Sequence, residues 1–197
     1  MTSRRDSVYP LLAVAVLITA AVFGVRPLIS YRALALGATP FEIGLIASSF
    51  AVLGLVGAVP IGRMTDRFGG RLVTMIGCSI VALVLFGIVF ADSLLLLAIA
   101  QAGLGLGQLM MAIGSHTAVT SRATGRRRDH EIGLYASAGS IGVGLGPIAA
   151  GFIAGEDVAG SRGQLVFLFA AGLALLAALA AAVLPSDRAA RERATSA

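Results

Sequence analysis

Six apolar segments, each close to 20 residues long, constrain the fold of this chain more than any other feature of its sequence. A helix needs about 20 apolar residues to cross the hydrocarbon core of a bilayer, and inside lipid its backbone must satisfy its own hydrogen bonds. The sequence therefore predicts an all-α integral membrane protein with six transmembrane helices. The predicted spans cover residues 8–29, 43–61, 72–91, 94–115, 132–154 and 165–184.

The composition excludes most soluble functions. Hydrophobic residues make up 57% of the chain and charged residues 13%, which is too apolar for a surface that faces water. The net charge of +5 does not indicate a nucleic-acid partner, because the basic residues form short clusters between apolar spans, where membrane topology places them. The single Cys78 lies inside an apolar run. We predict no nucleic-acid partner, no metal and no cofactor.

The arginines predict the orientation of the chain. Short cytoplasmic loops of membrane proteins carry an excess of basic residues, and here the opposite loops hold only Arg32 and Arg162. We therefore expect a multi-pass protein of the cell (inner) membrane with both termini in the cytoplasm. The arginines on the predicted cytoplasmic side are Arg4, Arg5, Arg63, Arg67, Arg71, Arg122, Arg126, Arg127, Arg128, Arg188, Arg191 and Arg193.

The spans differ in their polar content. Spans 2 and 5 are rich in glycine, which lets helix backbones approach closely, so we expect them in protein interfaces. Span 6 has no polar side chain and suits lipid. Spans 1 and 4 carry polar side chains at helical spacing and are the candidates for a solute path. The predicted path residues are Thr19, Arg26, Ser30, Gln101 and Gln108.

Arg26 is the one charge inside a predicted span. A charge within the membrane is costly, which makes it a functional candidate. Two interpretations stay open: the side chain extends to the outer interface, or it faces a water-filled cavity and binds an anionic group of the substrate.

Spans 2 and 5 also share a pattern of glycine and proline, at residues 57–62 and 144–149. This pattern predicts two three-helix repeats, residues 1–91 and 92–184, followed by a basic cytoplasmic tail at 185–197. Since each repeat has an odd number of spans, the second must be inverted relative to the first.

The segment after span 2 reads GRMTDRFGGR, and it resembles a signature of the major facilitator superfamily: Gly, three residues, Asp, Arg or Lys, any residue, Gly, then basic residues. Gly70 departs from it at one basic position. We expect a tight turn in which Asp66 caps a helix N-terminus and Arg67 pairs with a carboxylate. The alternative is a short basic loop that only follows topology. The signature residues are Gly62, Asp66, Arg67, Gly69 and Arg71.

Two further patterns bear on the type of transporter. Span 5 resembles the signature associated with the antiporters of this family, many of them exporters, and departs from it only at Ala150. A third pattern places an Arg in span 4, where this chain has Gln101, so the resemblance leaves the coupling ion unassigned. The antiporter-like residues are Gly133, Gly142, Gly146, Pro147 and Gly151.

The resemblance implies the N-terminal six-helix half of a major facilitator transporter, in which the first and fourth spans line a central path. The implied function is secondary transport of a small-molecule substrate across a lipid bilayer, by export more than uptake. A homodimer or a missing C-terminal half would complete it. Two alternatives stay open: a non-transporting scaffold or regulatory protein, and an inactive truncated product.

An intramembrane enzyme is a further reading, suggested by Ser137 and Ser140. It lacks a base, because neither His116 nor His130 falls deep in a predicted span. We predict no enzyme.

Overall fold

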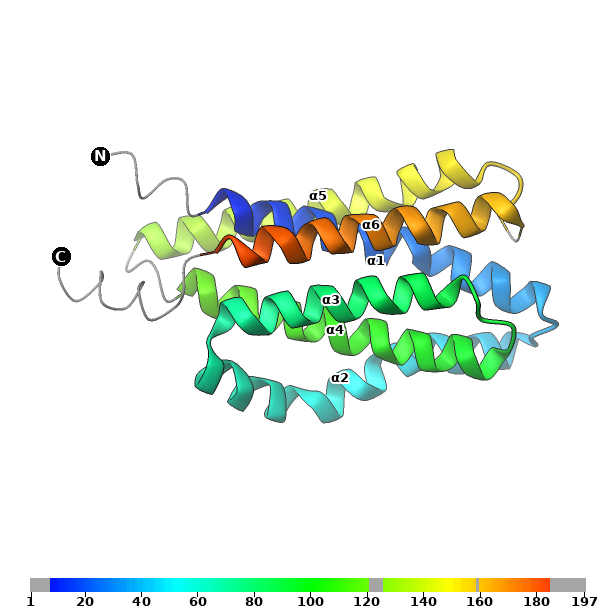
Figure 1. Ribbon diagram of the computed structural model, residues 1–197, viewed down its shortest axis with the longest axis horizontal. Helices are drawn as coiled ribbons and strands as arrows, with labels where there is room; N and C mark the ends of the chain where they lie inside the picture. Colours follow the sequence, from blue (N-terminus) through cyan, green and yellow to red (C-terminus); the bar gives the residue numbers. More distant parts are fainter. Residues whose placement is uncertain (1–7, 121–125, 159, 185–197) are drawn as a thin grey trace.

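The computed structural model describes residues 8–120, 126–158 and 160–184, which form a bundle of six long helices (Figure 1). All six are long and apolar enough to cross a membrane, which confirms the predicted all-α fold. The helices are α1 (Tyr9–Ala35), α2 (Pro40–Phe68), α3 (Gly70–Ile88), α4 (Leu94–Thr120), α5 (Arg126–Ala154) and α6 (Ser161–Ala182).

Local sequence sets the ends of α2. Thr39 and Glu42 form a capping box at its start, and Pro40 occupies the first turn, where its missing N–H costs no hydrogen bond. At its end Gly69 has a φ of 90°, a conformation that favours glycine. This one residue separates α2 from α3, which confirms the predicted tight turn.

Several helices run beyond the predicted apolar spans. We expected span 2 to end at residue 61, but α2 continues to Phe68; we expected span 5 to begin at residue 132, but α5 begins at Arg126. A helix of 29 residues is about 43 Å long, whereas the hydrocarbon core is about 30 Å thick, so polar ends can stay helical in the headgroup region. Most of the GRMTDRFGGR signature is therefore helical, where the sequence predicted a loop.

The most extensive helix packing joins the first three helices to the last three. The major pairs are α3 with α4, α1 with α5, α2 with α4, α3 with α6, and α1 with α6. Exchanging α1 with α4, α2 with α5 and α3 with α6 reproduces the same set, a pattern that agrees with an internal two-fold repeat. The two three-helix groups interlock, so each depends on the other for its packing.

Burial differs strongly between helices. The core is centred on α1, whose buried side chains include Val14, Ile18 and Val22, and α6 contributes Phe167. On α6 the inward face is mainly alanine and the outward face is leucine, which agrees with a lipid-facing helix. By contrast, α2 is exposed along most of its length and bows along the edge of the bundle in Figure 1.

The glycines of α2 and α5 do not all lie in interfaces. Gly57, Gly142 and Gly146 are buried against neighbouring helices. The expectation that both helices bury their glycines is therefore only partly met within this chain. The glycines of α2 and α5 that face open space are Gly44, Gly54, Gly62, Gly133, Gly144 and Gly151.

Two arginines donate hydrogen bonds to backbone carbonyl oxygens at the ends of neighbouring helices. Arg32, in the last turn of α1, donates to the carbonyl oxygens of Val89 (3.0 Å) and Ala91 (2.8 Å), just beyond the end of α3. Arg71, at the start of α3, donates to the carbonyl oxygen of Ala182 at the end of α6. Cations at these carbonyls satisfy acceptors that have no partner within the helix. Both residues therefore have packing roles that charge counting alone does not predict.

Candidate solute path

Arg26 lies between two phenyl rings. Its guanidinium carbon is 4.5 Å from the ring centre of Phe23, on α1, and 4.1 Å from that of Phe50, on α2. These distances are within the range of cation–π attraction. Within the part of the chain that the structure describes, no hydrogen bond or ion pair to Arg26 is found, and the side chain is half-buried. The rings therefore hold this charge without a counter-ion.

The direction of the Arg26 side chain is informative. Phe23 lies nearly one turn before Arg26, so the guanidinium points toward the start of α1 and deeper into the bundle. Side chains of α-helices tilt in this direction. Reaching the interface at the nearer end of α1, beyond Ala35, would require the opposite direction.

Phe50 links Arg26 to α4. Its backbone carbonyl lies so close to Gly105 that a methyl group at that position would overlap the oxygen. Gln101 is one turn from Gly105 on the same helix. The crossing of α2 and α4 therefore brings the aromatic pair around Arg26 close to Gln101.

Gln101 and Gln108 carry buried acceptors without partners. Gln101 is only 5% exposed, and the Oε1 atoms of both side chains have no hydrogen-bond partner among the described residues. The two residues lie two turns apart and share one face of α4. An unpaired buried acceptor costs about 1–3 kcal/mol, so both oxygens are available to a donor from outside the chain.

Arg26, Phe50 and Gln101 also lie at similar depths. The end of α1 and the starts of α2 and α4 lie at the same end of the bundle in Figure 1. At about 1.5 Å per residue, Gln101 is about 10 Å from the start of α4, Arg26 about 13 Å from the end of α1, and Phe50 about 15 Å from the start of α2. Gln108 lies about 10 Å deeper than Gln101. Arg26 and Gln101 thus lie at one level of the membrane, and Gln108 lies at a deeper level.

The structure does not bring Thr19 into this group. Its hydroxyl lies 2.6 Å from the carbonyl oxygen of Ala15 and 3.0 Å from that of Gly139, on α5. Thr19 therefore has its partners at the crossing of α1 and α5. Ser30 is half-buried and lies one turn beyond Arg26 on α1.

The GRMTDRFGGR signature, at the end of α2 and the start of α3, differs from the prediction in the position of Asp66. Asp66 is exposed in the last turn of α2, and α3 begins with no side-chain cap, so the prediction that Asp66 caps a helix N-terminus is wrong. The guanidinium of Arg67 lies 5.2 Å from the ring of Phe68.

The antiporter-like signature divides between two faces of α5. A methyl group at Gly142 would overlap Thr19 and the carbonyl of Val16, and one at Gly146 would overlap the carbonyl of Ala20. These two glycines therefore set the close approach of α5 to α1. On the outward face, Gly133 and Gly151 meet nothing, and Pro147 is exposed.

Sequence reasoning missed three residues near these sites. Phe23 could have been found, because it lies three residues before Arg26 on one helix. Phe50 carries no such signal, since its position depends on how α2 meets α1. Glu131 lies in the charged first turns of α5, outside the predicted spans, and is nevertheless only 8% exposed.

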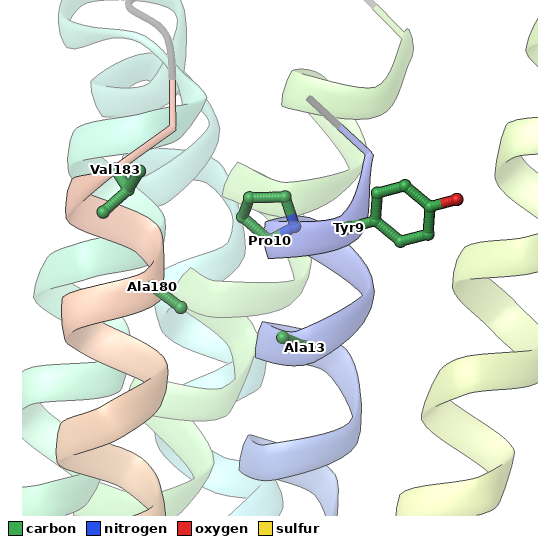
Figure 2. A pocket seen from close by; sticks show the side chains of 5 residues that line it. All are labelled: Tyr9, Pro10, Ala13, Ala180 and Val183. Carbon is green, nitrogen blue, oxygen red and sulfur yellow. The ribbon is translucent and has the colours of Figure 1, made fainter. Parts of the chain in front are cut away.

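A separate hollow of about 490 Å³ opens between the start of α1 and the end of α6. It is lined by Tyr9, Pro10, Ala13, Ala180 and Val183, and the Tyr9 hydroxyl points away from α6 (Figure 2). The lining is almost wholly apolar and contains none of the predicted path residues. It therefore gives no support to the path described above.

Comparisons with known proteins agree with the fold. The multidrug resistance protein 2 of Bacillus subtilis is 30% identical over 70% of this chain and 33% of its own length. The nitrite extrusion protein of the same organism is 31% identical over 77% of the chain and 38% of its own length. The crystal structure of a bacterial homologue of the human lysosomal transporter Spinster, in an inward-facing and occupied conformation, superposes with a TM-score of 0.81. That match has 16% identity and covers 94% of this chain and 46% of the other.

The chain thus spans less than half the length of these relatives. Its sequence matches the family model described as Major Facilitator Superfamily over residues 11–197, and its six helices superpose on half of a solved transporter. The chain therefore belongs to the Major Facilitator Superfamily.

Proposed function

We propose that this chain is one half of a transporter that exports a small solute across the cell membrane. The observation that carries the proposal is the set of unpaired polar groups on α1 and α4: the Arg26 guanidinium and the amide oxygens of Gln101 and Gln108. Such groups are costly in an apolar bundle, and they mark pathways when they face one another at successive depths. Export is supported by the names of two relatives, which refer to nitrite extrusion and multidrug resistance.

Each group has a distinct task in the proposed path. Arg26 attracts and orients the solute, while Gln101 and Gln108 accept hydrogen bonds from it at successive levels. Ser30 lies toward the mouth of the path beyond Arg26. Thr19 holds α1 against α5 and lines the path only at its edge.

The transporter also needs a second six-helix unit in this proposal. The chain covers less than half of its relatives, and α2 and α5 leave small residues on exposed faces, including Gly54 and Gly144. Small residues on a membrane helix allow another helix to pack closely. A second copy of this chain, or a separate half, would cover these faces. The two three-helix repeats, residues 1–91 and 92–184, would each contribute one cavity helix to the path.

Flux measurements test the proposal. The full chain in proteoliposomes should move nitrite, or a hydrophobic dye, faster than protein-free vesicles do. Gln108→Leu should lower the rate, because it removes an acceptor from the path. The control Ser79→Ala alters an exposed hydroxyl that bonds only to its own helix at Met75, and it should leave the rate unchanged. Absence of flux for both solutes by correctly folded protein would contradict transport by copies of this chain alone.

The orientation has its own test. Both described ends of the chain, at α1 and α6, lie at one end of the bundle. Reporters fused to the two termini should both be active in the cytoplasm, as the arginine distribution predicts. A periplasmic signal from either terminus would contradict the orientation while leaving the fold intact.

A further inference from the structure

We propose that Arg26, Phe23 and Phe50 form a binding site for a planar oxyanion, either the carboxylate of an organic acid or an inorganic ion of the same shape such as nitrite. This inference rests on the proposed function and names the class of solute that the path takes. It is carried by the geometry around the guanidinium.

In the proposed site the two rings cover the faces of the guanidinium and leave its edge free. Phe23 and Phe50 each lie within 4.5 Å of its central carbon, and no ring contact between the two is found among the described aromatic residues. We place them on different sides of the cation. The N–H donors of arginine lie in the plane of the group and point outward from its edge. A ligand must approach in that plane.

A planar anion with two oxygens fits this approach. Carboxylates bind arginine through two parallel N–H···O hydrogen bonds, in the plane of the guanidinium. The carboxylate and the guanidinium then both lie between the two rings. A tetrahedral anion such as sulfate places oxygens above and below the plane, where the rings lie. The site should therefore discriminate between anions of equal charge by shape.

The chain supplies no competing carboxylate at this depth. Neither α1 nor α4 contains Asp or Glu, and α2 has none between Glu42 and Asp66. The charge of Arg26 is therefore uncompensated by these three helices, in surroundings where Coulomb attraction is stronger than in water. An anion from outside the chain is the natural counter-ion.

Gln101 adds a preference within this class. Its unpaired amide oxygen accepts hydrogen bonds, so it repels an anion that has no donor group and can bind a ligand that carries an N–H or O–H group. An organic acid with such a donor can satisfy both groups, whereas nitrite can satisfy only Arg26. We therefore expect 4-hydroxybenzoate to bind more tightly than nitrite.

A tryptophan reporter makes the binding visible. The chain contains no tryptophan, so Phe23→Trp introduces a single tryptophan against the guanidinium while keeping an aromatic ring there. In nanodiscs, titration with 4-hydroxybenzoate, benzoate or nitrite should change its fluorescence, and sulfate and neutral benzamide should not. The thermal stability of the unaltered chain should rise with the same three anions, which guards against an effect of the reporter itself.

Substitutions at Arg26 test the assignment. Arg26→Gln should weaken benzoate binding on the order of tenfold to a hundredfold, and Arg26→Lys, which keeps the charge but not the paired donors, about tenfold. Arg162→Gln, which alters an exposed arginine in the first turn of α6, is the matched control and should bind normally. Equal binding of benzamide, or unchanged benzoate binding by Arg26→Gln, would overturn the inference.

Binding and flux separate this inference from the proposed function. Anion binding without flux in proteoliposomes would contradict transport by copies of this chain alone but support the oxyanion site. Flux of a neutral or cationic solute that is indifferent to Arg26→Gln would support transport and overturn the oxyanion site.

Discussion

Two helix crossings occupy equivalent places in the packing pattern and differ in whether their polar groups have partners. Where α1 crosses α5, glycines of the outer helix α5 meet α1, and the polar Thr19 finds acceptors at Ala15 and Gly139. Where α4 crosses α2, Gly105 of the inner helix meets the backbone of Phe50, and Gly57 of α2 meets Leu106. There the polar groups stay unpaired.

The difference separates packing from function. At the α1–α5 crossing the Thr19 hydroxyl has partners on both helices, so this crossing has the features of a structural joint. At the α2–α4 crossing the chain retains a charge between two rings and an unpaired amide oxygen, at a cost to stability. Proteins tolerate such costs mainly where a site needs them. In our proposal the α1–α5 crossing stabilises the bundle and the α2–α4 crossing binds the solute.

The largest effect should come from Gly142→Ala. The added methyl would overlap Thr19 and the backbone of Val16, so α1 and α5 must separate, with an expected loss of about 1–3 kcal/mol in the free energy of unfolding. Gly144→Ala is the control, because nothing lies within 4 Å of its added methyl. Better helix propensity should make that control as stable as the parent or more so. Denaturation midpoints in detergent would show the contrast.

Gly105→Ala should lower stability and binding together. The methyl would overlap the carbonyl of Phe50, and moving that backbone also moves the ring that covers Arg26. We expect a destabilisation of similar size, about 1–3 kcal/mol, with loss of the benzoate response. By contrast, folded Gly142→Ala protein should still bind. If both variants lost binding equally, the proposed division between the crossings would fail.

Gln101→Leu should have opposite effects on stability and function. Replacing a buried amide that lacks a partner removes an unfavourable term, so stability should stay level or rise by about 1 kcal/mol. Flux should fall, and the preference for 4-hydroxybenzoate over benzoate should disappear. A marked loss of stability instead would mean that the amide already has a partner, and that the α2–α4 crossing is structural as well.

The sequence predicts the fold far better than the site. The six spans follow from apolar run length, which depends on bilayer thickness alone. Helix ends such as Phe68 and Arg126 do not, because helices continue past the hydrocarbon with polar residues. The close packing of Gly142 and the exposure of Gly144 also cannot be predicted from the sequence. Both residues are glycines of the same helix, and only the rotation of α5 about its axis decides which of them faces α1.

The path residues show the same limit. Arg26 stands out in the sequence because a charge within a span is rare. Its partner Phe50 does not, because an aromatic residue in an apolar span is ordinary and the meeting of α1 with α2 is a tertiary feature. Thr19 was grouped with Arg26 by helical spacing. The structure gives its hydroxyl a carbonyl one turn back and another on α5, an option open to any threonine in a helix.

The smallest effect should come from Thr19→Val, which tests whether Thr19 belongs with packing or with transport. Valine keeps the shape and removes one hydroxyl hydrogen bond, so the free energy of unfolding should fall by about 0.5–1.5 kcal/mol. Flux and benzoate binding should not change, because the hydroxyl faces α5 rather than the unpaired groups. Thr117→Val is a matched control on α4, since its hydroxyl bonds only to its own helix at Ile113. If Thr19→Val abolished flux at normal stability, Thr19 would belong to the solute path after all, and both crossings would line it.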